Sequence, residues 1–278
     1  MRIFAIAPNP ISATNKKQYN QNTFQGKIPK SANVADTFQK SVDKIAEEKR
    51  VNQLWNTARL FRYCFFKPVY INQVEGLQQK YKDILKIKDK DEFLDKAFNE
   101  LKNDYGLADI PIELDKNFKR GTKFQELKSS AAMFPYYKKG FIKIGVDKKY
   151  SNKKLFTDLA HELRHVLQQL KIYQYGSKSE LKKAMFNGFL DAYPNIEKSE
   201  LSFCKSGLNE HVDAHFEFFK NAGVKRIRRK DEGYSFAQKL IEATNSSTKK
   251  SSEAYDSNFV ERDAIRTEAF LMHAITGK

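Results

Sequence analysis

The chain has 278 residues, of which 40% are hydrophobic, so it is long enough to bury a core in one compact domain with additions or in two small domains. Its formal net charge is +16, and the basic residues are spread over the whole length, which favours anionic partners without identifying one. Its two cysteines, Cys64 and Cys204, exclude a disulfide framework, and no apolar run approaches the length of a membrane span.

The first third of the chain is predicted to be a tail followed by helices. Residues 1–35 are predicted to be a disordered tail, because from residue 8 onward they are rich in Asn, Gln, Lys, Ser and Thr with scattered Pro and Gly. The apolar residues 3–7 are too few for a secretory signal peptide, so we expect a cytoplasmic protein, with export by a non-classical route left open. Residues 36–105 carry apolar side chains at helical spacing and are predicted to form a helical region, closed by Gly106.

Short strands are predicted after the helical region. Residues 110–114 are typical of a short strand, and residues 140–146 alternate apolar with polar or small side chains, as a half-buried strand does. Residues 131–137 are its predicted partner, and Pro135 restricts that partner to the edge of a sheet. We therefore expect a mostly helical α+β fold with a small antiparallel sheet packed beside the helix that follows. An extended peptide can join the edge of such a sheet as an additional strand.

The next predicted helix carries an H-E-x-x-H motif, H-E-L-R-H at residues 161–165. Ser151 is a typical N-cap for this helix, and apolar side chains recur behind it at helical spacing. His161 and His165 are four residues apart and therefore lie about 40° apart around a helix, so both imidazoles can bind one ion. Glu162 lies on the flank of that face, where it can polarise a metal-bound water without binding the metal. Zn²⁺ suits this arrangement, because it binds imidazole nitrogens and keeps one position open for water in catalytic sites.

A catalytic zinc site needs a third protein ligand. The extended motif H-E-x-x-H-x-x-G-x-x-H is absent, because Gln168 and Lys171 occupy the positions of its glycine and third histidine. The remaining common solution is a glutamate from a later helix. Residues 258–272 have a helical pattern and lie in a segment rich in candidate ligands. The candidates there are Glu261, Asp263, Glu268 and His273.

A second histidine pair, His211 and His215, also has the four-residue spacing of a metal site. It has no glutamate directly after the first histidine, so it lacks the general base of a zinc peptidase. We interpret it as the polar edge of an amphipathic helix. The alternatives are a structural metal site, a place among the ligands of the first site, or a position in a segment that covers the catalytic cleft.

Residues 161–168 and 261–264 together resemble the glutamate-type zinc metallopeptidases (gluzincins), in particular small bacterial or phage members with H-E-L-x-H-x-x-Q followed by E-x-[DE]-A. The resemblance implies a zincin-like catalytic domain over residues 106–278, with Glu261 as the third zinc ligand and Tyr255 near the site as a catalytic residue. The interval between the two signatures is long, so a helical insertion is expected at about 177–243. Arg164 places a charge where such motifs usually have an uncharged residue, and its side chain can point to solvent.

These observations predict a zinc-dependent endopeptidase that acts on a protein or peptide substrate. Glu162 would take a proton from the attacking water, Tyr255 would help to stabilise the oxyanion, and the strand at residues 141–146 would hold the substrate backbone. The alternative is a non-catalytic, degenerate zincin, a basic protein that contacts nucleic acid or anionic surfaces. Nucleic acid is not favoured, because no recognisable nucleic-acid module is present.

Overall fold

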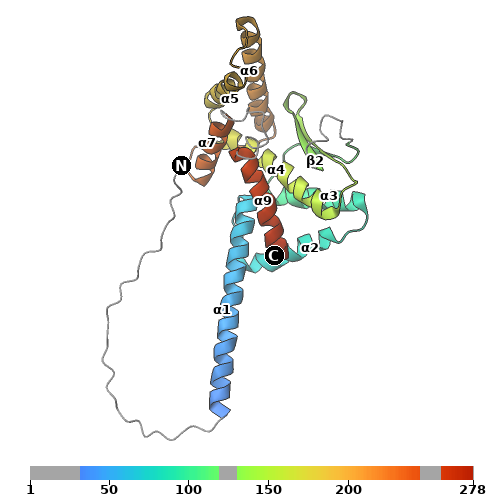
Figure 1. Ribbon diagram of the computed structural model, residues 1–278, viewed down its shortest axis with the longest axis vertical. Coiled ribbons are helices and arrows are strands. Elements are labelled where there is room, and N and C mark those ends of the chain that lie inside the picture. The colour runs from blue at the N-terminus through green and yellow to red at the C-terminus, as the bar shows by residue number, and fades with distance from the viewer. Residues whose placement is uncertain (1–31, 119–129, 245–257, 278) are drawn as a thin grey trace, which may run out of the picture. The chain divides into compact units, whose positions relative to one another are not determined.

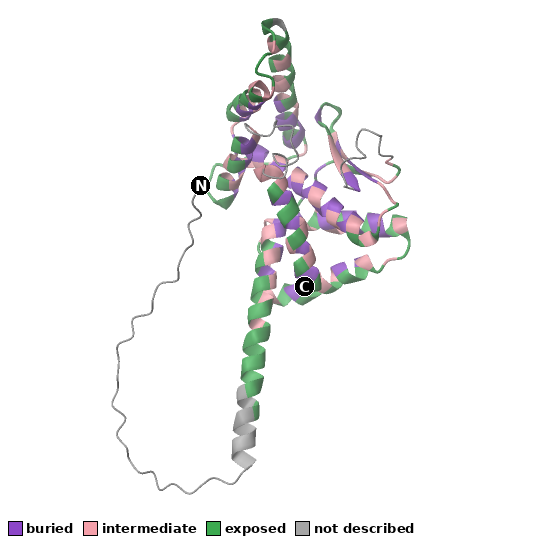
Figure 2. Ribbon diagram, in the orientation of Figure 1, coloured by how far each residue is buried: buried purple, intermediate pink, exposed green. Residues whose placement is uncertain are grey.

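The structure is a computed structural model that describes residues 32–118, 130–244 and 258–277 (Figure 1). The chain divides into two compact units, Met1–Lys49 and Arg50–Lys278. Of the first unit, the structure describes the beginning of helix α1 (Ala32–Phe65), where the side chains of residues 42–49 are exposed (Figure 2). Residues 1–31 of the predicted tail lie outside the described residues, and residues 32–35 belong to α1.

Three helices precede the sheet in the second unit. Helix α1 ends at Phe65, and α2 (Ile71–Leu85) and α3 (Lys90–Asp104) follow it. Asp89 caps α3, because its side chain accepts a hydrogen bond of 2.8 Å from the backbone N–H of Glu92. The apolar faces of these helices are buried in the hydrophobic core of this unit, as their helical spacing predicts. Residues 50–105 therefore share one compact unit with the sheet and the later helices.

The sheet has three strands, β1 (Ile112–Asp115), β2 (Ala131–Tyr136) and β3 (Phe141–Val146), in the order β1-β3-β2. Strand β2 runs antiparallel to β3, and β1 runs parallel to β3. The sheet is therefore mixed, whereas the sequence predicted an antiparallel one. The alternation of side chains identifies a strand but carries no information on the direction in which it pairs. The expected edge position of the strand with Pro135 is correct.

Helix α4 (Asn152–Tyr175) is the central helix of the second unit and packs against β2, α3, α7 and α9. It begins where the sequence predicts, because the Ser151 hydroxyl accepts a hydrogen bond of 3.3 Å from the backbone N–H of Lys154. Among the residues described after α4, four further helices follow it. They are α5 (Lys178–Ala192), α6 (Lys198–Asn221), α7 (Glu232–Thr244) and α9 (Phe259–Thr276).

The expected fold class, α+β and mostly helical with a small sheet beside the H-E-x-x-H helix, is confirmed. Figure 1 shows α9 alongside α4, which brings the C-terminal segment to the histidine motif. Helices α5, α6 and α7 occupy the interval between these two parts of the site. No helix in the described ranges is long and apolar enough to cross a membrane.

Candidate metal centre

The two histidines of α4 and Glu261 of α9 form one half-buried cluster. The Nε2 atoms of His161 and His165 are 3.0 Å apart. Glu261 Oε2 lies 3.4 Å from the first of these nitrogens and 3.5 Å from the second. Among the described residues, this is the one group of three or more His, Cys, Asp or Glu side chains whose ligand atoms converge in this way.

Glu261 reaches this position because α9 begins beside the histidine motif. Asn258 is the N-cap of α9, and its side chain accepts a hydrogen bond of 2.8 Å from the backbone N–H of Val260. Glu261 therefore lies in the first turn, where a carboxylate is also favoured by the positive end of the helix dipole. Of the candidate third ligands, the structure brings Glu261 to both histidines.

The spacing of the three atoms fits a single small cation. In a tetrahedral site with bonds of about 2.0–2.1 Å, neighbouring ligand atoms lie about 3.3 Å apart. The three observed separations, 3.0, 3.4 and 3.5 Å, lie close to that value. The donor set fits as well, because two imidazoles and one carboxylate offer three lone pairs to one point.

The other ring nitrogens of the two histidines fix the direction of these lone pairs. His161 Nδ1 lies 2.5 Å from Glu268 Oε1, and His165 Nδ1 lies 2.9 Å from Gln168 Oε1. Both partners are acceptors, so each Nδ1 carries the hydrogen and each Nε2 presents its lone pair to the cluster. A carboxylate or amide oxygen that orients a metal-binding histidine in this way is a regular feature of metal sites.

The electrostatics of the cluster favour a positive charge at its centre. Burial lowers the pKa of His161, but hydrogen bonds with Glu261 and Glu268 raise it by more, and the resulting pKa is about 10. Burial and the neighbouring His161 lower the pKa of His165, but its hydrogen bond with Glu261 and the charges of Glu162 and Glu261 together raise it by more. A bound cation supplies the same positive charge that these protons would supply.

Glu162 lies beside the cluster without joining it. Its side chain is buried, with 8% of the residue exposed. Burial raises its pKa, while the two histidines and a hydrogen bond from the backbone N–H of Met133 lower it in part. A carboxylate whose pKa is raised towards neutrality is suited to accept and release a proton.

The hydrogen bond to Glu162 identifies the side of β2 that faces away from β3 as the part of the sheet beside the cluster. In an antiparallel pair, alternate residues direct their backbone groups towards the partner strand and away from it. Met133 N–H points to Glu162 and therefore away from β3. Pro135, two residues further on, faces the same way, so its missing N–H costs no hydrogen bond to β3. The outward side of β2 therefore lies beside the cluster, with Met133 N–H bound to Glu162.

The expectation that residues 141–146 hold a substrate backbone is wrong. Strand β3 lies between β1 and β2, so its backbone groups on both edges are already paired. An additional strand needs unpaired backbone N–H and C=O groups. Within this part of the sheet, the edge next to the cluster belongs to β2.

Arg164 is buried, in contrast to the expectation that its side chain can point to solvent. The residue is 1% exposed. Its Nε and Nη2 atoms donate hydrogen bonds of 2.7 and 2.9 Å to the two carboxylate oxygens of Asp263. Its Nη1 donates to the backbone oxygens of Tyr63 and Cys64 at 3.2 and 2.9 Å. The buried charge is therefore neutralised and hydrogen-bonded at the end of α1.

Asp263 connects this ion pair to the histidine cluster. The Gln168 Nε2 atom donates to Asp263 Oδ2 at 2.8 Å and to the backbone oxygen of Val260 at 2.9 Å. The same amide accepts a hydrogen bond from His165 through its oxygen. Asp263 is thus a buried carboxylate that fixes α9 against α4, and it does not reach the metal cluster. Burial raises the pKa of Asp263, but the hydrogen bonds and charge of Arg164, together with the hydrogen bonds from Tyr63 and Gln168, lower it by more, so the carboxylate is ionised.

The described histidines of the other predictions, His211, His215 and His273, lie outside the cluster. His215 is buried among aromatic rings, and its Nε2 lies 3.1 Å from the backbone oxygen of Gln169. Burial lowers its pKa to about 3, so it is a neutral core histidine rather than part of a polar edge. The ring of His211 is 5.4 Å from that of Tyr137. His273 is exposed in the last turn of α9. Tyr255 lies outside the described residues.

Three contributions to the site were not predicted from the sequence. They are the Met133 backbone, the Gln168 amide and the hydrogen bond of Glu268 to His161. The contact of Gln168 with His165 could have been predicted, because a residue three positions after His165 lies on the same helical face. The other two contacts join segments that are far apart in the sequence, and spacing along the chain gives no information on them.

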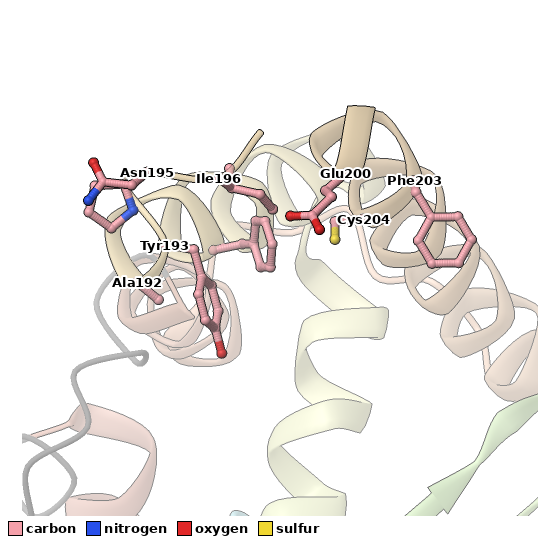
Figure 3. Close-up of a pocket in the computed structure, with 9 residues that line it drawn as sticks. Ala192, Tyr193, Asn195, Ile196, Glu200, Phe203 and Cys204 are labelled. Atoms are coloured by element: carbon pink, nitrogen blue, oxygen red, sulfur yellow. The ribbon is translucent and has the colours of Figure 1, made fainter. Parts of the chain in front are cut away.

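A surface pocket of about 920 Å³ does not belong to this site. It lies where α5 leads into α6, and Figure 3 shows Tyr193 and Phe203 among its largely apolar lining. It contains none of the clustered histidines or carboxylates.

No protein-family model, curated protein or solved structure matches this chain. Its function must therefore be inferred from its own residues. The most specific chemistry among the described residues is the cluster of α4 and α9.

Proposed function

We propose that the protein is a zinc-dependent endopeptidase. The observation that carries the proposal is the convergence of His161, His165 and Glu261 next to a separate buried carboxylate, Glu162. A structural zinc site is usually closed by four protein ligands and has no need of a general base. Three ligands with an acid beside them are the arrangement of a hydrolytic site.

Zinc is the cation that suits this donor set best. Imidazole with a carboxylate favours Zn²⁺ over Mg²⁺ or Ca²⁺, which prefer oxygen ligands. When bound, zinc would lower the pKa of a water molecule and polarise the carbonyl of the scissile bond. His161, His165 and Glu261 would hold it, with Glu268 and Gln168 orienting the two imidazoles.

The residues of the chain supply the remaining steps. Glu162 accepts the proton of the attacking water and then transfers it to the leaving amine. An extended peptide that runs along the outward side of β2 would have its backbone beside Glu162. The substrate is therefore a peptide or an unfolded protein segment. A cytoplasmic location is part of the same proposal and rests on the sequence alone.

Metal content and hydrolysis together test the proposal. We expect the purified chain to carry stoichiometric zinc and to cleave a mixture of unstructured peptides, and we expect a chelator to abolish cleavage and added zinc to restore it. Glu261→Ala should lose both zinc and activity, because only two ligands remain. The matched control is Glu242→Ala, an exposed carboxylate on α7, which should keep both.

Two outcomes would contradict parts of this proposal. Stoichiometric zinc in Glu261→Ala would show that another residue is the third ligand. A zinc-loaded chain that leaves every peptide intact would be a binding protein built on the same metal site, which is the alternative function.

Glu268→Ala is expected to weaken zinc binding by about 10–100-fold without removing a ligand. Glu268 Oε1 accepts a hydrogen bond of 2.5 Å from His161 Nδ1, which holds the ring with its Nε2 towards the cluster. Competition with a zinc chelator of known affinity measures the change. An affinity equal to that of the wild type would mean that the ring keeps its orientation without this carboxylate.

A further inference from the structure

A second pocket, lined by residues of α1, α4, α7 and α9 and of the turn after α1, has a volume of about 760 Å³. This volume lies within the range of about 300–1,000 Å³ that is typical of small-molecule sites. Basic side chains dominate its polar lining, and two carboxylates, Glu232 and Asp263, oppose them. The basic residues are Arg59, Arg62, Lys67, Arg164, Lys239 and Arg266.

Three of these cations are already paired. Arg164 is bound to Asp263, Arg62 lies 3.3 Å from Glu232, and Lys67 lies 3.0 Å from Asp104. The other three are Arg59, Lys239 and Arg266, which are exposed. Within residues 32–118, 130–244 and 258–277, none of the three forms an ion pair with a carboxylate. The pocket therefore has an excess of positive charge at its rim.

Aromatic rings form another part of the lining. The rings of Phe66 and Phe236 are 5.1 Å apart, and those of Phe236 and Phe259 are 5.9 Å apart. The buried Arg164 guanidinium lies over the Phe236 ring at 5.2 Å. A planar group can stack on such rings and on a guanidinium.

The backbone at Phe66 is an independent sign of a functional site. Phe66 follows the last residue of α1 and has a φ of 52°, the one positive φ among the non-glycine residues described. A bulky residue in this conformation is an outlier that the surrounding packing must hold in place. Such outliers cluster at ligand sites. The turn places the Phe66 ring in the lining of the pocket.

We propose that this pocket binds a nucleoside polyphosphate, with its phosphates at Arg59, Lys239 and Arg266 and its base against the aromatic lining. The phosphates match the basic residues of the lining and the base matches its aromatic rings, so the ligand needs both parts. A long nucleic acid would need a basic stripe, whereas these cations gather around one pocket. The inference does not depend on the proposed peptidase activity, because no metal-cluster residue lines the pocket.

Calorimetric titration of the full chain with ATP, tripolyphosphate and adenosine, each with excess Mg²⁺ and in about 150 mM salt, tests the proposal. We expect one ATP to bind per chain, tripolyphosphate to bind more weakly and adenosine to bind most weakly. Arg59→Gln with Arg266→Gln should weaken ATP binding about tenfold or more, because it removes two charge-assisted contacts.

The matched control is Arg50→Gln with Arg228→Gln, which removes the same charge from exposed positions outside the pocket. ATP should bind this variant as it binds the wild type. An equal loss of ATP affinity in both double variants would mean that general electrostatic attraction holds the ATP, and it would overturn the proposal. It would also be overturned by equal affinities for ATP and tripolyphosphate, or by the absence of ATP binding to a chain that keeps its zinc and its folded state.

Discussion

Glu162→Gln is expected to abolish peptide hydrolysis while the chain keeps its zinc and its fold. General-base catalysis contributes about 10²–10⁴-fold to a rate, and an amide cannot accept the proton of the attacking water. Glutamine has nearly the same shape as glutamate, and its side-chain oxygen can still accept the hydrogen bond from Met133 N–H. Because burial already raises the pKa of Glu162, removing this charge should not destabilise the protein.

The measurement is the turnover of a fluorogenic peptide together with zinc content and the urea midpoint. Glu113→Gln is the matched control, since Glu113 is an exposed carboxylate on β1, and its activity should equal that of the wild type. If Glu162→Gln retained zinc and turned over peptide within about threefold of the wild-type rate, the general base would be another group. A variant without zinc would show instead that Glu162 is needed to form the metal site.

The histidine motif and its helix could be predicted because they depend on local spacing. Ser151 caps α4 and the four-residue interval aligns His161 with His165, and both features are independent of the rest of the fold. Glu261 was named from a resemblance of short motifs, and its position beside both histidines depends on the docking of α9 against α4. Spacing alone left Asp263, Glu268 and His273 as competing candidates.

The burial of Arg164 could not be predicted from its neighbours in the sequence. A charged side chain within an amphipathic helix normally lies at its solvent-facing border, since burial of an unpaired charge is costly. Arg164 is buried because its partner, Asp263, is 99 residues away and supplies two carboxylate oxygens. The order of the strands could not be predicted for the same reason. The pairing between β1 and β3 joins segments that are distant in the sequence, and the alternation of side chains along each strand does not reveal it.

Arg164→Met is expected to lower the free energy of unfolding by about 3–5 kcal/mol, because it leaves the Asp263 charge buried without its main partner. Asp263→Leu should cost a similar amount, since it leaves the guanidinium of Arg164 uncompensated. The double variant should recover a large part of the loss, because both charges are then absent. It should still bind zinc more weakly than the wild type, since Gln168 loses its hydrogen bond to Asp263 and holds His165 less firmly.

Urea unfolding of the zinc-saturated variants measures these differences, and the exposed pair Arg50–Glu75 provides the comparison. Its side chains are 58% and 64% exposed, so Arg50→Met should cost no more than about 1 kcal/mol. Both arginines are paired with a carboxylate, and the two pairs differ in burial. A loss at Arg164 no larger than that at Arg50 would mean that water reaches the buried pair. In that case Asp263 would contribute little to holding Glu261 against the two histidines.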